Sequence, residues 1–282
     1  MRLPLTVVVA SLVVGLGVFG GLACGGGSEA APVETTAPAP LERLRIIFPE
    51  GFTVREMADR VAAVREIAIA KRKVTPRLTR AAYLRAVERA VPPPRFRKDL
   101  ERDSMEGFLF PAGYEFTQAT TAKELVADQL EAFRERFGSV DLSYARSKNL
   151  TPYDVLIIAS MIEEETAVPR ERRLVAAVIY NRLRNRMPLG IDATLRYGFH
   201  IPPTESIRQS QINDTSNPYN TRKLPGLPPT PIANPGLASL QAAAHPAKVD
   251  YLYFVRKPDK KHHFFTASAA EFDKYKAEHG YP

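Results

Sequence analysis

The sequence predicts a mixed α+β protein preceded by an N-terminal membrane anchor. Helical patterns and short apolar strand patterns share the chain, and they lack the regular β/α alternation that is typical of a parallel sheet. The composition is that of an ordinary globular protein, with 45% hydrophobic and 25% charged residues among 282. A chain of this length can bury a sizeable core in one or two domains.

The chain begins with an uncharged apolar segment. No charged residue lies between Arg2 and Glu29, and the apolar run at 7–23 approaches the roughly 20 residues that span a bilayer. Residues 1–23 are therefore predicted to be a retained anchor, with a cleaved signal peptide as an alternative. A lipoprotein signal that ends at Cys24 is a third interpretation. All three place the remaining residues outside the cytoplasm, and an anchor would hold them at the outer face of the cell membrane.

Residues 24–42 are mostly glycine, alanine, proline and threonine. Such a segment buries too little apolar surface to fold, so it is predicted to be a flexible linker. The net charge of +8 favours an anionic partner, either a cell-wall polymer or anionic lipid. No helix-turn-helix or RNA-binding motif occurs, so nucleic acid is not expected as a partner. Five histidines and one cysteine argue against a Cys/His zinc site.

The first half is predicted to contain two strands among helices. A capping-box pair, Thr53 and Glu56, indicates the start of the first helix. In chain order the expected elements are a strand at 44–48, a helix from 53, a mostly helical and basic segment at 65–99, an aromatic turn at 106–111, a strand at 114–116 and a helix at 120–137.

The second half opens on a strong helix start, because Thr151 can cap the helix, Pro152 suits its first position and Asp154 its third. This helix runs to three glutamates and is broken by Pro169. The elements expected after it are a helix at 171–186, loops at 191–194 and 213–236, a helix at 237–244, a strand at 251–255 paired with 262–265, and a helix at 271–278.

The three glutamates are the first candidate for chemistry. At 100° per residue, Glu165 falls inside the apolar arc of its helix, Glu164 lies opposite the arc and Glu163 lies at its edge. Glu165 is therefore predicted to face the protein, where desolvation raises the pKa of a carboxyl group and keeps it neutral, as a general acid requires. The alternative is a solvated helix end whose glutamates pair with Arg170, Arg172 and Arg173.

A second carboxylate is needed for ordinary glycoside hydrolysis. Asp192 is the nearest later candidate, in the predicted loop beside Thr194 and Tyr197. An aspartate that only stabilises a turn is the plain alternative.

Nine short segments occur in the order and spacing of one known family, from about residue 100 to the end of the chain. They are 106–111, 159–166, 181–183, 192–194 with Tyr197 and Gly198, 217–221, 226–229, 234–236, 243–247 and 251–255. Through these segments the chain resembles the YceG-like family of endolytic murein transglycosylases. Each segment is weak alone, but nine in order are specific, and an N-terminal membrane span also fits this family.

The resemblance implies a lytic reaction on peptidoglycan that needs no metal or cofactor. One glutamic acid protonates the oxygen between N-acetylmuramic acid and N-acetylglucosamine, and the C6 hydroxyl of the muramic residue attacks its own C1 to give a 1,6-anhydro end. The resemblance assigns this role to Glu165, which precedes Thr166, with Glu163 as the reserve candidate. It also implies endolytic cutting that terminates glycan strands near the membrane, beside proteins of wall synthesis.

The resemblance further implies substrate-binding residues and a domain division. The substrate-binding candidates are Asn181, Asp192, Thr194, Tyr197, Tyr219, Asn220 and His263, each with a structural alternative as a cap, core or strand residue. The catalytic domain is expected at 104–282, after a shortened LysM-like subdomain at 43–103 whose first half is missing. Independent glycan binding by that subdomain is therefore in doubt.

Three rival functions stay open. The chain could be a wall-binding module without activity, an interaction protein that uses the proline-rich stretch 224–231, or a conventional hydrolase with water as its nucleophile.

Overall fold

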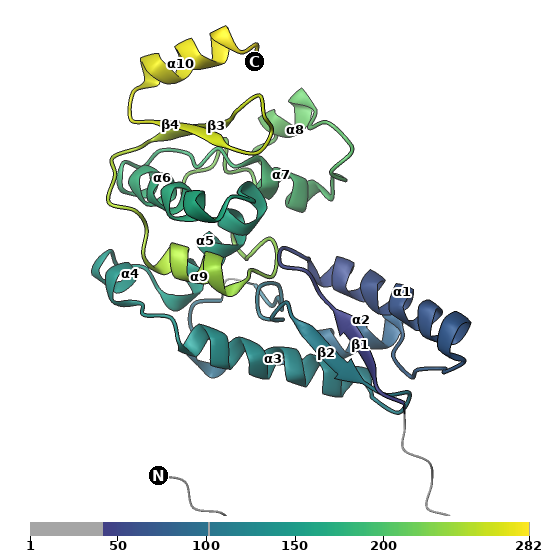
Figure 1. Ribbon diagram of the computed structural model, residues 1–282. Helices are drawn as coiled ribbons and strands as arrows, with labels where there is room; N and C mark the ends of the chain where they lie inside the picture. Colours follow the sequence, from purple (N-terminus) through teal and green to yellow (C-terminus); the bar gives the residue numbers. More distant parts are fainter. Residues whose placement is uncertain (1–41, 101, 282) are drawn as a thin grey trace, which may run out of the picture. The chain divides into compact units, whose positions relative to one another are not determined.

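The computed structural model describes residues 42–100 and 102–281, which lie in one compact unit (Figure 1). The predicted anchor at 1–23 and almost all of the predicted linker lie outside the described residues. Within the described part of the chain, no helix is both long enough and apolar enough to cross a membrane.

Two short strands and three helices form the first part of this unit. Strand β1 (Leu44–Ile47) pairs antiparallel with β2 (Gly113–Phe116), so that Ile46 lies opposite Tyr114. The helices are α1 (Val54–Arg72), α2 (Arg80–Glu88) and α3 (Ala122–Gly138). The predicted capping box of Thr53 and Glu56 is confirmed at the start of α1.

The prediction for 65–99 was too helical. Helix α1 ends at Arg72, α2 occupies only nine residues, and a 3-10 turn at Pro94–Phe96 follows. Proline explains both gaps, because Pro76 and the run 92–94 supply no backbone N–H group for a helix. Thr79 instead caps α2, its side chain accepting a hydrogen bond from the N–H group of Ala82 at 3.1 Å.

Helix α5 (Pro152–Glu165) lies at the centre of the second part. Nine of its residues are buried, at Tyr153 and 155–162, because helices pack around it. These neighbours are α6 (Arg172–Arg184), α7 (Asp192–Phe199) and α9 (Leu237–Ala244), and α9 lies alongside α5 in Figure 1. The short helices α4 (Ser143–Ser147) and α8 (Gln209–Asn213) and a 3-10 turn at Pro169–Glu171 complete this part.

One predicted loop is a helix. Residues 191–194 were expected to be irregular, but Asp192, Ala193 and Thr194 form the first turn of α7. The Thr194 hydroxyl donates to the carbonyl of Ile191 at 2.7 Å and the Thr221 hydroxyl binds the same carbonyl at 3.3 Å, so side chains stabilise this helix start. The partner from residue 221 is distant in sequence and could not be read from the local pattern.

The C-terminal hairpin confirms the prediction with a small shift. Strand β3 (Tyr253–Arg256) pairs antiparallel with β4 (His263–Thr266), and α10 (Ala269–Glu278) packs beside both. The observed elements therefore form the predicted mixed α+β fold, with two separate two-stranded sheets among the described residues.

The predicted boundary at 103/104 falls inside one hydrophobic core. Strand β1 precedes this boundary and its partner β2 follows it, and one cluster includes Phe48, Tyr114 and Ile158. Asn234 adds polar links, because its side chain donates to the carbonyl of Phe52 at 2.8 Å and accepts from the N–H group of Leu109 at 3.0 Å. The segment predicted to be LysM-like is thus packed into the same unit as the segments that follow it.

Candidate active site

The three glutamates lie on the last turn of α5, where a buried helix emerges from the core. The apolar residues before them anchor the helix, and extended backbone at Thr166 ends it. Carboxylates are disfavoured at a helix C-terminus, because the last carbonyl groups carry partial negative charge. The charge state of each glutamate therefore depends on the groups that surround its carboxyl group.

Glu163 is tied into the structure. Its side chain is 6% exposed, lies 3.4 Å from Nη2 of Arg172 and accepts a hydrogen bond of 2.8 Å from the N–H group of Gly236, the N-cap of α9. Arg172 also donates to the hydroxyl of Ser239 at 3.1 Å. For Glu163 the alternative of an ion pair with a nearby arginine is therefore confirmed.

The helical arc predicted that Glu165 faces the protein, and burial is the main cause of the raised pKa of its carboxyl group. The arc placed Glu163 at its edge, but this side chain is enclosed as well and is only 6% exposed. The physical reason is the position of α9, whose first turn packs against the Glu163 side of α5.

Glu165 faces the start of α7. Burial raises the pKa of its carboxyl group to about 7, and the Asp192 carboxylate contributes to this increase. Three groups lower this pKa: the Arg256 side chain, a hydrogen bond from the N–H group of Ala193, and the Arg222 side chain. No ion pair holds Glu165 among the described residues. A carboxyl group of this kind can both donate and accept a proton near neutral pH.

Glu164 is in contact with solvent on the same turn. Burial of its carboxyl group raises the pKa to about 8, and the carboxylates of Glu56, Glu163 and Glu165 add to the effect. It lies beside the turn at Gly51, where a Cβ atom on the glycine would approach Oε1 of Glu164 to 2.9 Å. Three adjacent glutamates therefore have three different environments.

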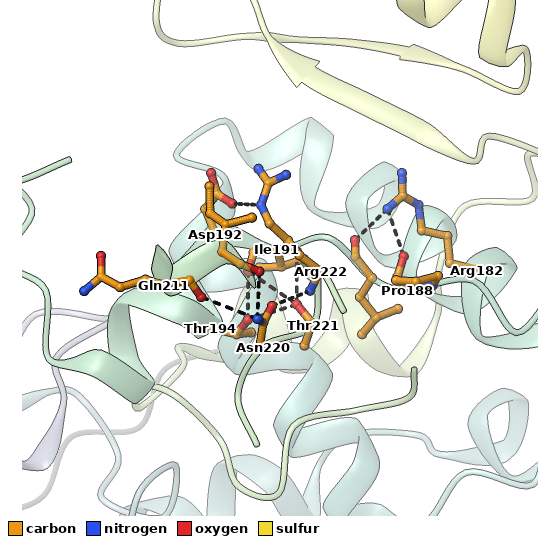
Figure 2. Close-up of polar contacts among 11 residues, drawn as sticks. Arg182, Pro188, Ile191, Asp192, Thr194, Gln211, Asn220, Thr221 and Arg222 are labelled. Atoms are coloured by element: carbon orange, nitrogen blue, oxygen red, sulfur yellow. Dashed lines mark hydrogen bonds and ion pairs between the residues drawn. The ribbon is translucent and has the colours of Figure 1, made fainter. Parts of the chain in front are cut away.

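The first turn of α7 is joined to residues 220–222 (Figure 2). Nε of Arg222 lies 2.5 Å from Oδ1 of Asp192, and the Thr221 hydroxyl accepts from the N–H group of Ile191 at 3.1 Å. The hydroxyl groups of Thr194 and Thr221 are 2.9 Å apart. This network holds the backbone next to Glu165 in place.

Several of the predicted binding residues form hydrogen bonds inside the protein. Asn181 donates to the carbonyls of Val249 and Tyr251, both at 2.9 Å, and the fully buried Asn220 donates to those of Ile212 and Asp214 at 3.0 and 2.7 Å. Thr194 is also fully buried. In this structure these three side chains support neighbouring backbone, and a direct substrate contact stays a prediction.

His263 is likewise buried, in a pair with Glu171. Nδ1 of His263 lies 2.8 Å from Oε2 of Glu171, and both side chains are less than 10% exposed. This pair joins the end of the 3-10 turn before α6 to β4. His263 is therefore a buried strand residue whose ring is paired inside the protein, and a substrate contact stays a prediction.

Tyr197 and Tyr219 remain partly exposed beside one another. Their ring centroids lie 5.0 Å apart in an edge-to-face arrangement. The Tyr197 hydroxyl donates to Glu106 at 3.3 Å, and that of Tyr219 lies 2.8 Å from the Thr230 hydroxyl. A partly exposed aromatic pair can stack against a sugar ring.

Sequence reasoning did not identify Arg222, Arg256 or Glu106 as part of this region. Glu106 stands in a recognised segment, and Arg222 directly follows another, so proximity to these segments was an available signal. Arg256 ends β3 and approaches Glu165 only through the tertiary fold.

Comparisons with known proteins bear on this arrangement. The sequence model of the YceG-like family matches residues 31–278. A protein of Bacillus subtilis (strain 168) named endolytic murein transglycosylase is 31% identical over 241 residues, which cover 83% of this chain and 65% of that protein. One of the same name from Streptococcus pneumoniae (strain ATCC BAA-255 / R6) is 34% identical over 181 residues, 63% of this chain and 33% of that protein.

A solved structure shares the fold. The crystal structure of a yceG-like protein from Listeria monocytogenes matches with a TM-score of 0.67 and 27% identity, over 86% of this chain and 78% of that one. The chain spans just under two thirds of the Bacillus relative and about one third of the Streptococcus relative.

Proposed function

Because the chain belongs to the YceG-like family, we propose that it is an endolytic murein transglycosylase. Its substrate would be the glycan strand of peptidoglycan, and the bond cut would be the β-1,4 link from N-acetylmuramic acid to N-acetylglucosamine. The observation that carries this proposal is Glu165, a partly exposed residue at the end of α5 whose carboxyl group has a pKa of about 7 and no ion pair among the described residues.

The reaction needs one group that acts first as an acid and then as a base. Protonated Glu165 donates its proton to the glycosidic oxygen, and the bond from that oxygen to C1 of the muramic residue breaks. The C6 hydroxyl of the same residue attacks C1, and its proton passes to the Glu165 carboxylate. The products are an anhydro end and a free C4 hydroxyl, and the enzyme returns to its starting state without consuming water.

Glu163 suits a supporting role. It already neutralises Arg172 and caps α9, so its carboxylate is committed to the fold. The aromatic pair of Tyr197 and Tyr219 supports sugar stacking, and Asp192 with Arg222 supports a stable start of α7.

The proposal extends to the location of the enzyme. An anchor at 1–23 would hold the catalytic part on the outer face of the cell membrane, where nascent strands and proteins of wall synthesis lie. Cutting there would terminate strands at a height determined by the linker.

The decisive experiment is mass spectrometry of uncrosslinked glycan strands digested with the purified full chain. Wild type should release 1,6-anhydro ends. Glu165→Gln should lower their release by about 100-fold or more, because a general acid contributes roughly 10²–10⁴ in rate. The thermal midpoint of this variant should not fall, since no ion pair is broken.

Glu163→Gln is the matched control. It keeps the shape of the side chain but removes the charged partner of Arg172, whose side chain is only 12% exposed, so we expect a lower thermal midpoint with anhydro products still formed below it. Reducing ends from the wild type would support the hydrolase instead. Loss of products only in Glu163→Gln would transfer the catalytic role to Glu163.

A further inference from the structure

The carboxyl group of Glu165 faces charges from three other segments. Asp192 belongs to α7, Arg222 to the loop that precedes α9, and Arg256 to β3, while Glu164 adds a carboxylate from the same helix. The N–H group of Ala193 donates a hydrogen bond to Glu165 from the first turn of α7. Asp192 and Arg222 pair with each other, so two opposite charges near Glu165 are held together.

The ion pair between Asp192 and Arg222 is expected to add little to the stability of the fold. Its side chains are 48% and 40% exposed, and exposed pairs contribute only about 0.2–1 kcal/mol to stability. The same two segments are already joined by Thr221, which bonds with Ile191 and Thr194, and by the Gly190 N–H group, which donates to the Thr221 carbonyl at 2.8 Å. Loss of the ion pair is therefore expected to change the charges that act on Glu165 more than the stability of the fold.

Resting on the proposed function, we propose that Asp192 and Arg222 are positioning residues for Glu165. They place two linked opposite charges beside its carboxyl group, while the bonds of Thr221 hold the first turn of α7 in place. Neither side chain needs to touch the reacting atoms.

The physical basis is the double use of Glu165. An unpaired Asp192 would favour the protonated form of Glu165 and make it a poor base, whereas an unpaired Arg222 would favour the carboxylate and make it a poor acid. A closed pair offsets the two charges. The group can then release a proton in the first half of the reaction and accept one in the second.

The two partners therefore have opposite electrostatic effects. Asp192→Asn removes a negative charge and leaves Arg222 unpaired, so it should lower the pKa of Glu165 by roughly 0.5–1 pH unit. Arg222→Gln removes a positive charge and leaves Asp192 unpaired, so it should raise this pKa, by a smaller amount because Arg222 acts more weakly on Glu165 than Asp192 does. If the ion pair were only a structural bond, both variants would lose it equally, and the pKa of Glu165 would shift in the same direction in both.

The measurement is a carbon-13 NMR titration of the glutamate carboxyl signals in the full chain in detergent micelles. The Glu165 signal is assigned by its absence from Glu165→Gln. In parallel, the pH at which release of anhydro ends declines on the alkaline side should move down in Asp192→Asn and up in Arg222→Gln. Arg222→Lys keeps the charge and should bring both readouts back toward the wild-type values.

Asp59 and Arg80 provide the matched control. They also form an Nε–Oδ1 pair of 2.5 Å with about half-exposed side chains, but it joins α1 to α2 and neither charge acts on Glu165. Asp59→Asn and Arg80→Gln should leave the titration of Glu165 unchanged.

Shifts of the same sign in Asp192→Asn and Arg222→Gln, or shifts no larger than those of the control pair, overturn the proposal. The titration uses no glycan, so it separates this inference from the proposed function. A wild type that releases no anhydro ends, combined with opposite shifts, would refute the transglycosylase while leaving the electrostatic link intact.

Discussion

The carboxyl group of Glu106 lies inside the protein, 4% exposed, where three segments meet. It accepts hydrogen bonds from the N–H group of Val54 at 3.0 Å, from the amide of Asn234 at 2.8 Å and from the Tyr197 hydroxyl at 3.3 Å. Burial nevertheless raises its pKa to about 8. At neutral pH this group is therefore largely a neutral acid that links the start of α1 to α7.

This charge state predicts how stability depends on pH. The pKa of Glu106 is about 8 in the folded protein and near 4.5 when unfolded, so its contribution is fully present below pH 4.5 and is lost as pH rises through 8. Glu106→Gln can keep the hydrogen bonds without ionising. It should match wild type at pH 5 and be more stable by roughly 2–4 kcal/mol at pH 9. Urea unfolding of both proteins at pH 5 and pH 9 measures this difference in the free energy of unfolding. The same pH dependence in the two proteins would contradict the prediction.

At the scale of elements, the turn after Glu106 depends on a glycine. Gly107 has φ of +87°, and a Cβ atom there would lie 2.7 Å from Cγ of Pro231 and 3.2 Å from Cδ2 of Leu156. The turn is thus pressed between α5 and the proline-rich loop. The recognised segment 106–111 therefore packs against Pro231 and Leu156 at this turn.

Gly107→Ala should therefore destabilise the protein through two effects. The left-handed backbone costs about 1 kcal/mol and the clash adds roughly 1–3 kcal/mol, so we expect the thermal midpoint to fall by roughly 5–10 °C. Gly226→Ala is the control, since Gly226 has φ of +90° with no atom within 4 Å of the added Cβ. It should lower the midpoint by only about 2–4 °C, and equal shifts would show that packing around Gly107 is irrelevant.

At the scale of the whole molecule, one core joins the predicted LysM-like part to the rest. Phe48 follows β1, is 2% exposed, and its ring lies 6.2 Å from that of Tyr83 and 6.1 Å from that of Tyr114. It therefore connects residues on both sides of the predicted 103/104 boundary. Such a core is expected to unfold cooperatively.

Phe48→Ala tests this cooperativity. The variant should lose about 3–5 kcal/mol and show one unfolding transition, with hydrogen-exchange protection lost in parallel from α1 and from α5. Ile47→Ala is the matched control, because Ile47 is the preceding residue and is 56% exposed. Two transitions, with protection of α5 unchanged, would indicate that 43–103 and 104–282 are independent domains.

The sequence by itself determined the elements with strong local signals. The start of α5 at Thr151 and Pro152, the bounds of α9 and the C-terminal strand pair follow from capping residues, turns and apolar runs. Strands β1 and β2 were each predicted, but their pairing was not. It also selected the turn of three glutamates, because carboxylates at the end of an apolar helix are unusual in any fold.

Only the tertiary structure decided what distinguishes these glutamates. Glu163 is buried by Gly236, 73 residues away, and Glu165 is surrounded by charges from α7, β3 and the loop that contains Arg222. The helical start at Asp192 likewise depends on Thr221. A periodic pattern records which side of a helix is apolar, but the pKa of a side chain depends on the atoms that pack against it from distant parts of the chain.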